Sequence, residues 1–98
     1  MTEIGVGIIG SRFMAGIHTE SLKRIRGARV VAVASPTEGK AQAFAEKHDI
    51  PKAFLDHRAL LELPEVDMVV VCTPNRFHAP IAIDAARAGK HIVVEKPL

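Results

Sequence analysis

One stretch decides the fold: Ile4-Gly5-Val6-Gly7-Ile8-Ile9-Gly10-Ser11-Arg12-Phe13-Met14-Ala15-Gly16-Ile17-His18. Its first seven residues are glycine, valine and isoleucine, which is typical of a parallel strand buried on both faces. The period then becomes that of an amphipathic helix, whose predicted inner stripe is Met14, Ile17, Ser21, Leu22 and Ile25. The stretch therefore predicts a strand, a turn and a helix.

Two glycine patterns compete for the turn. Residues 5–10 match G-x-G-x-x-G letter by letter, but the first two glycines lie inside the predicted strand, and the pattern binds phosphate only where it opens a helix. One step later, Gly10 falls in the turn, with Arg12 and Ala15 at the second and third glycine positions. We therefore predict a pyrophosphate-binding loop of Gly10, Ser11, Arg12, Phe13 and Met14. The alternative is a plain glycine turn with a solvated Arg12.

Composition narrows the class of protein. The chain has 98 residues and 48% hydrophobic residues, enough for one domain with a core. Its 13 basic and 11 acidic residues are interspersed, which gives little support for nucleic-acid binding. No apolar run approaches the roughly 20 residues of a membrane span. Cys72 excludes an internal disulfide, and its apolar surroundings predict a buried, inert thiol in a reducing compartment, hence the cytoplasm.

Further strands and helices alternate along the chain. We predict strands at 29–34, 53–55, 67–72 and 91–94, and helices from the turn to Arg26, from a Thr37 cap to residue 48, from an Asp56 cap to Leu63, and at 77–88. Gly27 and Gly89 are expected to cap helices. The predicted inner stripes are Ala41, Phe44, Ala45 and His48 in the second helix, and Ile81, Ala82, Ala85 and Ala88 in the last. This alternation predicts an α/β fold, a doubly wound parallel sheet with strand order three-two-one-four-five.

In such a sheet the ligand lies beyond the carboxyl ends of the strands, where four loops converge: 10–14, 35–37, 73–78 and 95–97. A carboxylate after the second strand would bind the ribose hydroxyls of NAD, but this position holds Ser35. Neutral Ser35 and Thr37, with Lys40 and Arg12 nearby, favour the 2′-phosphate of NADP. NAD remains possible, since Ser35 and Thr37 can simply begin a helix and Lys40 can be solvated.

Polar residues also follow the last two strands. At the end of the fifth strand, Lys96 of Glu95-Lys96-Pro97 would point toward the reactive end of the cofactor, where a lysine can donate to a substrate oxygen. Asn75 and His78 flank the same cleft, although turn and helix-cap roles account for them as well. A surface ion pair is the alternative for Glu95 and Lys96. Asp56-His57 is interpreted as a helix cap, and no metal-ligand spacing is present.

Together these stretches resemble the nucleotide-binding half of the Gfo/Idh/MocA oxidoreductase family. The resemblance rests on the loop through Phe13-Met14, on His18, on Thr73-Pro74-Asn75 with His78, on Ala88-Gly89-Lys90-His91 and above all on Glu95-Lys96-Pro97. It implies a Rossmann-like fold and a nicotinamide-dependent enzyme for a sugar, cyclitol or related hydroxyl compound. It places Gly10 to Ala15 at the pyrophosphate and Ser35 at the ribose. Thr73, Pro74 and Asn75 would lie along the cofactor, and Glu95 and Lys96 at the nicotinamide, with Lys96 catalytic.

The chain departs from the family pattern at Arg12, Ala15 and Ser35, and it stops at Leu98, before the last strand of the nucleotide domain and before the substrate domain. We therefore expect residues 1–98 to be an incomplete NAD(P)-binding domain. The leading interpretation is part of an NADP-preferring sugar or polyol dehydrogenase that forms homo-oligomers. The alternatives are a non-catalytic dinucleotide sensor and a purely structural domain.

Overall fold

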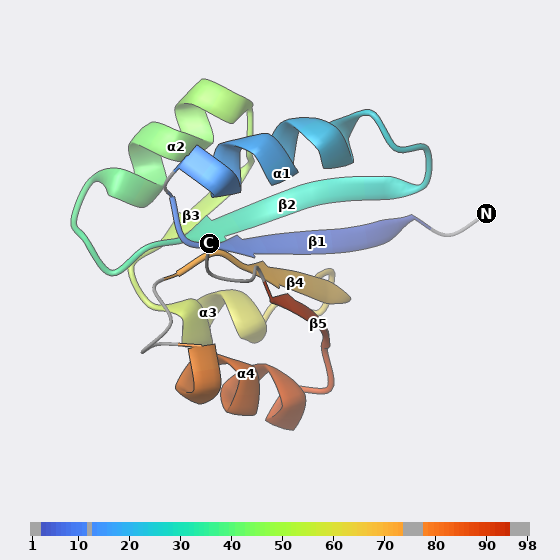
Figure 1. Ribbon diagram of the computed structural model, residues 1–98, viewed down its shortest axis with the longest axis vertical. Helices are drawn as coiled ribbons and strands as arrows, with labels where there is room; N and C mark the ends of the chain where they lie inside the picture. Colours follow the sequence, from blue (N-terminus) through green and yellow to red (C-terminus); the bar gives the residue numbers. More distant parts are fainter. Residues whose placement is uncertain (1–2, 12, 74–77, 95–98) are drawn as a thin grey trace.

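The computed structural model describes residues 3–11, 13–73 and 78–94. Within these residues lies one parallel sheet of β1 (Ile4–Ile9), β2 (Ala28–Ala34), β3 (Lys52–Phe54), β4 (Met68–Val71) and β5 (His91–Val94). The strand order is β3-β2-β1-β4-β5, with β1 at the centre (Figure 1). The predicted parallel sheet and its strand order are confirmed.

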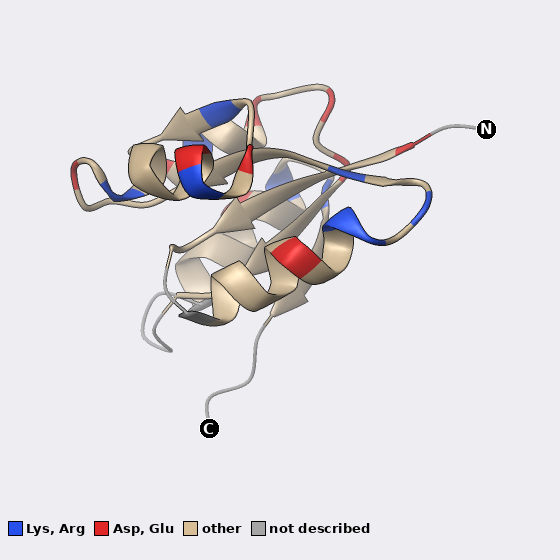
Figure 2. Cartoon of the chain, turned by 90° about the horizontal axis from the view of Figure 1, so that it is seen from above, with Lys and Arg blue, Asp and Glu red and all other residues tan. Residues whose placement is uncertain are grey.

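Two helices cover each face of this sheet (Figure 1). On one face, α1 (Phe13–Lys23) and α2 (Lys40–His48) enclose a cluster that contains Val6, Ile8, Ala15, Val33 and Phe44. On the other face, α3 (His57–Leu61) and α4 (His78–Arg87) enclose a cluster that contains Ile9, Leu60, Val69, Val71 and Ile81. Charged residues of both signs are interspersed over the outer helices and loops, as the coloured segments of Figure 2 show. The sheet is thus the middle layer of three.

The glycines inside β1 serve packing. A Cβ atom on Gly5 would lie 1.8 Å from the Glu65 carbonyl oxygen, and one on Gly7 would lie 2.5 Å from Leu60 Cδ2. The first position lets the loop before β4 lie against β1, and the second lets α3 sit close to the sheet. These contacts account for the two glycines that precede the phosphate-loop position.

The predicted inner stripe of α1 is wrong at Ile17, Ser21 and Ile25, although Leu22 packs against the core. Ile17 is 43% exposed and Ile25 54%, whereas Ala15 and Thr19 are fully buried. Thr19 can be buried because its hydroxyl donates to the Ala15 carbonyl oxygen at 2.8 Å, so its polar group is satisfied within the helix. The helix also ends at Lys23 and not near Arg26, and a turn leads from there to β2.

The start of α2 also differs from the prediction. Thr37 does not cap it: the helix begins at Lys40, after Gly39 with φ 81°, and no side chain caps it. The Thr37 carbonyl instead accepts a bond of 3.1 Å from the Lys40 amide. The inner stripe is confirmed, since its four residues are buried: Ala41, Phe44, Ala45 and His48.

The remaining elements follow the sequence with small shifts. Asp56 caps α3 as predicted, accepting 2.8 Å from the Arg58 amide. Ala88 lies beyond the end of α4 and is exposed, so its place in the buried stripe is wrong, whereas Gly89 has the left-handed φ of 77° expected of a cap. Cys72 is half-buried and not buried as predicted. In the described parts of the chain, no helix has the length and apolarity to cross a membrane.

Candidate functional site

The carboxyl ends of β1 and β2 bring two serines together. Ser11 comes shortly after β1 and Ser35 comes directly after β2, and the Ser11 hydroxyl donates to the Ser35 oxygen at 3.4 Å. Ser35 is only 5% exposed, and its amide donates 3.0 Å to the Phe54 carbonyl of β3. Ser11, predicted for the pyrophosphate, and Ser35, predicted for the ribose, are therefore adjacent at the carboxyl ends of the strands.

Gly10 shapes the turn between β1 and α1. Its φ is 118°, which side-chain-bearing residues rarely adopt, and a Cβ atom would lie 2.8 Å from the Cys72 carbonyl oxygen. Its amide donates 2.8 Å to the Ala34 carbonyl at the end of β2. The turn is thus tight and leaves the chain at the N-terminus of α1, where free amides and the helix dipole favour an anion.

The loop after β2 carries the remaining described residues of the predicted ribose site. Thr37 and Lys40 are exposed, and Lys40 is the first residue of α2. Glu38, which the sequence interpretation did not weigh, is exposed between them. A carboxylate four residues after the strand end is a signal that the sequence alone offers. The loop therefore presents one cation and one anion beside the buried Ser35.

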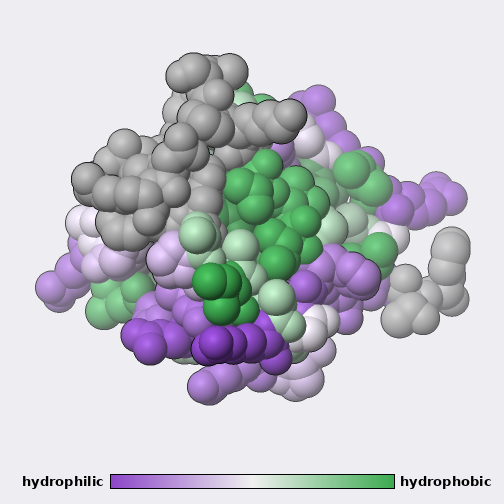
Figure 3. All heavy atoms as spheres, turned by 60° about the horizontal axis from the view of Figure 1, so that its bottom comes forward, coloured by the Kyte–Doolittle hydropathy of each residue, from purple (hydrophilic) through white to green (hydrophobic). Residues whose placement is uncertain are grey.

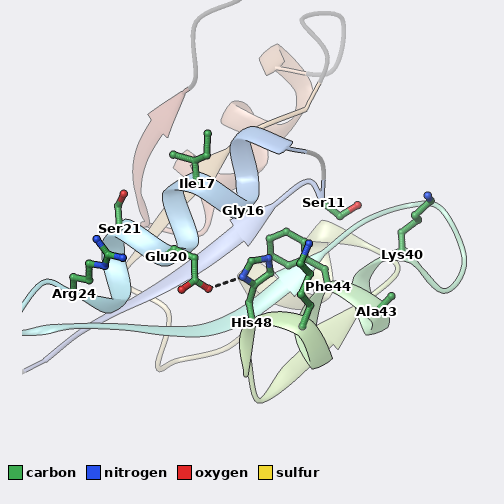
Figure 4. Close-up of a pocket in the computed structure, with 11 residues that line it drawn as sticks. Ser11, Gly16, Ile17, Glu20, Ser21, Arg24, Lys40, Ala43, Phe44 and His48 are labelled. Carbon is green, nitrogen blue, oxygen red and sulfur yellow. Dashed lines mark hydrogen bonds and ion pairs between the residues drawn. The ribbon is translucent and has the colours of Figure 1, made fainter.

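A groove of about 610 Å³ runs between α1 and α2 from this edge of the sheet (Figure 4). Ser11 and Lys40 lie at one end of it and Ser21 and Arg24 at the other. Of the residues that line the groove, the sequence predicted only Ser11 and Lys40 as site residues. The other described lining residues were not predicted: Gly16, Ile17, Glu20, Ser21, Arg24, Ala43, Phe44, Lys47 and His48. Ile17 was missed because it was expected to face the sheet.

The other half of the predicted site lies largely outside the described residues. Thr73 follows β4 and is half-buried, and Met14, in the first turn of α1, is half-buried too. Arg12, Pro74, Asn75, Glu95 and Lys96 are among the residues that the structure does not describe, as are the side chains of Phe13 and His78. Of the predicted site residues that the structure describes, Gly10, Ser11, Ser35 and the start of α2 are therefore brought together.

Known proteins share this architecture. Residues 4–98 match the family described as "Oxidoreductase family, NAD-binding Rossmann fold". Myo-inositol 2-dehydrogenase of Thermotoga maritima is 38% identical over 93 residues, which are 95% of this chain and 28% of that protein. A levoglucosan dehydrogenase in complex with NADH superimposes with a TM-score of 0.91 at 31% identity, over 98% of this chain and 28% of its own.

A third relative is the scyllo-inositol dehydrogenase of Lactobacillus casei, solved with bound NAD(H) and scyllo-inositol. It has a TM-score of 0.88 and 26% identity, over 98% of this chain and 28% of its own. The chain thus spans a little over a quarter of the length of these relatives.

Proposed function

The chain belongs to the Gfo/Idh/MocA oxidoreductase family, whose NAD-binding Rossmann domain it matches over residues 4–98, and on this premise we propose that it forms the cofactor-binding part of a dehydrogenase for a sugar, cyclitol or related hydroxyl compound. The relatives named above act on inositols and levoglucosan, which supports this substrate class. We further propose that this protein prefers NADP to NAD.

The NADP preference rests on one observation, the neutral Ser35 at the end of β2. A carboxylate in this position would accept the ribose hydroxyls and repel a 2′-phosphate. Ser35 instead offers a hydroxyl, and the Ser11 hydroxyl lies 3.4 Å from it. Thr37 and the Lys40 ammonium, both exposed in the next few residues, supply a further donor and a charge that complements phosphate. Arg12 would add a second cation.

The residues of this chain would hold and orient the cofactor, whose nicotinamide supplies a hydride acceptor when bound. Gly10 and Ser11 open the helix whose N-terminus suits the pyrophosphate. In this proposal Thr73, Pro74, Asn75, His78 and Glu95 line the path to the nicotinamide. Lys96 donates a hydrogen bond to the substrate oxygen and thereby polarises the group that reacts.

Two properties of the whole protein, its cellular location and its oligomeric state, complete the proposal. A cytoplasmic location follows from the lone cysteine, since secreted domains of this size commonly carry several. A homo-oligomeric state of the whole protein is the second.

Calorimetry on the whole protein tests the cofactor preference. NADPH should bind more tightly than NADH. Arg12→Ala or Lys40→Ala should reduce the ratio of NADPH affinity to NADH affinity, because each removes a cation near the 2′-phosphate. The matched variant Glu38→Gln removes the neighbouring negative charge and should increase this affinity ratio. Equal affinities for the two cofactors, or tighter NADH binding, would contradict the NADP preference and leave the family assignment intact.

A further inference from the structure

A histidine joins the two helices that carry the proposed cofactor site. His48 is the last residue of α2, and its Nδ1 atom lies 2.6 Å from Glu20 Oε2 on α1 (Figure 4). His48 is 8% exposed, whereas the Glu20 side chain is 51% exposed. The hydrogen bond from His48 is the main cause that holds the pKa of the Glu20 carboxyl below its ordinary 4.5. The contact is therefore a short hydrogen bond between a buried imidazole ring on α2 and an exposed carboxylate on α1.

The surroundings fix the ring and strengthen the link. The Phe44 ring packs on it with centroids 4.4 Å apart, and a Cβ atom on Gly16 of α1 would lie 3.5 Å from its Nε2 atom. Lys23 of α1 donates 2.9 Å to the His48 carbonyl oxygen and lies 3.9 Å from Glu20 Oε2. We call His48, Glu20 and Lys23 the α1–α2 clasp. Both the ring and the backbone of His48 are thus bound to α1.

The clasp lies at the opposite end of α2 from the site. Lys40 begins this helix and His48 ends it, which separates them by about 12 Å at the usual rise per residue. Near the site, the Ser11 and Ser35 side chains of the two βα units are linked at 3.4 Å. Between these two points both helices line the groove. Besides the packing of both helices on the sheet, the clasp therefore constrains the distance from the N-terminus of α1 to that of α2.

We propose that His48 is a positioning residue for the dinucleotide site: by holding the end of α2 to Glu20 and Lys23 of α1, it sets the spacing between the pyrophosphate loop before α1 and the ribose-binding start of α2. This rests on the function proposed above. A dinucleotide spans both helix ends, and a ligand that reaches only one end gains nothing from their spacing. The positioning role should therefore affect the affinity of a ligand that contacts both helix ends, and not the affinity of one that contacts a single end.

This difference in ligand reach gives the test. NADPH spans the ribose end and the pyrophosphate loop, whereas 2′-AMP has no 5′-phosphate and reaches the ribose end only. Both affinities are measured by calorimetry on the whole protein. His48→Ala should weaken NADPH binding by about tenfold, the equivalent of losing one good hydrogen bond. The same variant should leave 2′-AMP binding within about twofold.

Three further variants keep the test decisive. Glu20→Ala breaks the clasp from its exposed side, so it tests the proposal even if His48→Ala does not fold, and it should change the ratio of the two affinities in the same direction. His48→Gln retains a donor for Glu20 and should restore much of the NADPH affinity. Lys52→Met removes a 3.0 Å ion pair with Glu65 that does not join α1 to α2, and it should leave the ratio unchanged.

The outcomes separate the two proposals. If the wild-type protein binds NADH in place of NADPH, the NADP preference fails, and the same comparison is made with NADH and adenosine. If the wild-type protein binds neither dinucleotide, the proposed function fails. If it binds a dinucleotide and neither His48→Ala nor Glu20→Ala changes the ratio, or if both ligands weaken equally, the positioning role is overturned and the clasp serves stability alone.

Discussion

Leu60 of α3 occupies the space that Gly7 of β1 leaves open: a Cβ atom on Gly7 would lie 2.5 Å from Leu60 Cδ2 and 3.2 Å from Cγ. Leu60 is fully buried, so the contact lies within the core on that face. The tight approach of α3 to the central strand therefore requires a residue without a side chain at position 7.

Gly7→Ala should lower the free energy of unfolding by about 2 kcal/mol or more, because the new methyl group overpacks a filled core. Urea unfolding measures the loss. Gly16→Ala is the matched control, since its methyl group would make an ordinary contact of 3.5 Å and alanine favours a helix by about 0.5–1 kcal/mol. If both variants lost the same free energy of unfolding, the close packing of Leu60 against Gly7 would not be the cause of the destabilisation.

Asp56 should make stability depend on pH. The Arg58 amide, followed by the Arg58 side chain, holds the pKa of this carboxyl below its ordinary 3.8. A depressed folded-state pKa stabilises the fold above the unfolded-state pKa, and this contribution disappears as the pH falls through the folded-state value. Asp56→Asn keeps a cap that does not titrate.

The stability difference between wild type and Asp56→Asn should thus be constant down to about pH 5 and change only below it, as urea unfolding at several pH values will show. A difference that changes mainly between about pH 6 and pH 8 would contradict this assignment.

Ser35→Asp should reverse the proposed cofactor preference. The new carboxylate would repel the 2′-phosphate and accept the ribose hydroxyls, so NADPH affinity should fall by about tenfold or more while NADH affinity rises. Calorimetry with both cofactors measures the change. Ser35→Asn, similar in shape but uncharged, separates charge from size, and an equal effect of both variants would argue against a 2′-phosphate at Ser35.

Lys96→Ala in the whole protein should lower kcat by about 100-fold while NADPH affinity changes less than about threefold, because the proposed pyrophosphate and ribose contacts lie elsewhere. Steady-state kinetics beside a cofactor titration gives both numbers. Residues 1–98 alone should show no turnover with sugars or polyols. Undiminished turnover in the variant would remove Lys96 from the mechanism, and lost cofactor binding would make its role structural.

Residues 1–98 on their own should self-associate through β5. Val93 and Val94 are 44% and 40% exposed, and Ile83 of α4 is 51% exposed. Figure 3 shows apolar side chains gathered on this face. An apolar sheet edge recruits further strands, so sedimentation at micromolar concentration should show species larger than a monomer, and Val93→Lys should reduce them. A clean wild-type monomer would rule out pairing at this edge.

The sheet could be predicted because its signals are local and strong. Runs such as Val69-Val70-Val71 between turn residues mark buried parallel strands, and the handedness of βαβ units then limits their order. The inner stripe of α2 was equally readable, since Phe44 and His48 lie at helical spacing.

The inner face of α1 could not be read from hydropathy. Thr19 is fully buried and Ile17 is 43% exposed, because a hydrogen bond within the helix satisfies the threonine and the isoleucine faces the groove. The Glu20–His48 hydrogen bond could not be predicted for another reason. Its partners lie 28 positions apart, and their contact depends on how two helices pack. Tertiary packing, and not local propensity, decided both.

The central place of β1 constrains the order in which the chain folds during synthesis. One neighbour, β2, ends at Ala34, but the other, β4, ends only at Val71, and the bond from the Gly5 amide to Asp67 Oδ2 joins positions 62 apart. A nascent chain that has reached residue 60 therefore exposes one edge of its central strand, β1, to the cell. Such an unpaired edge is prone to aggregation. We expect the ribosome-bound intermediate to need chaperone protection until Val71 has emerged.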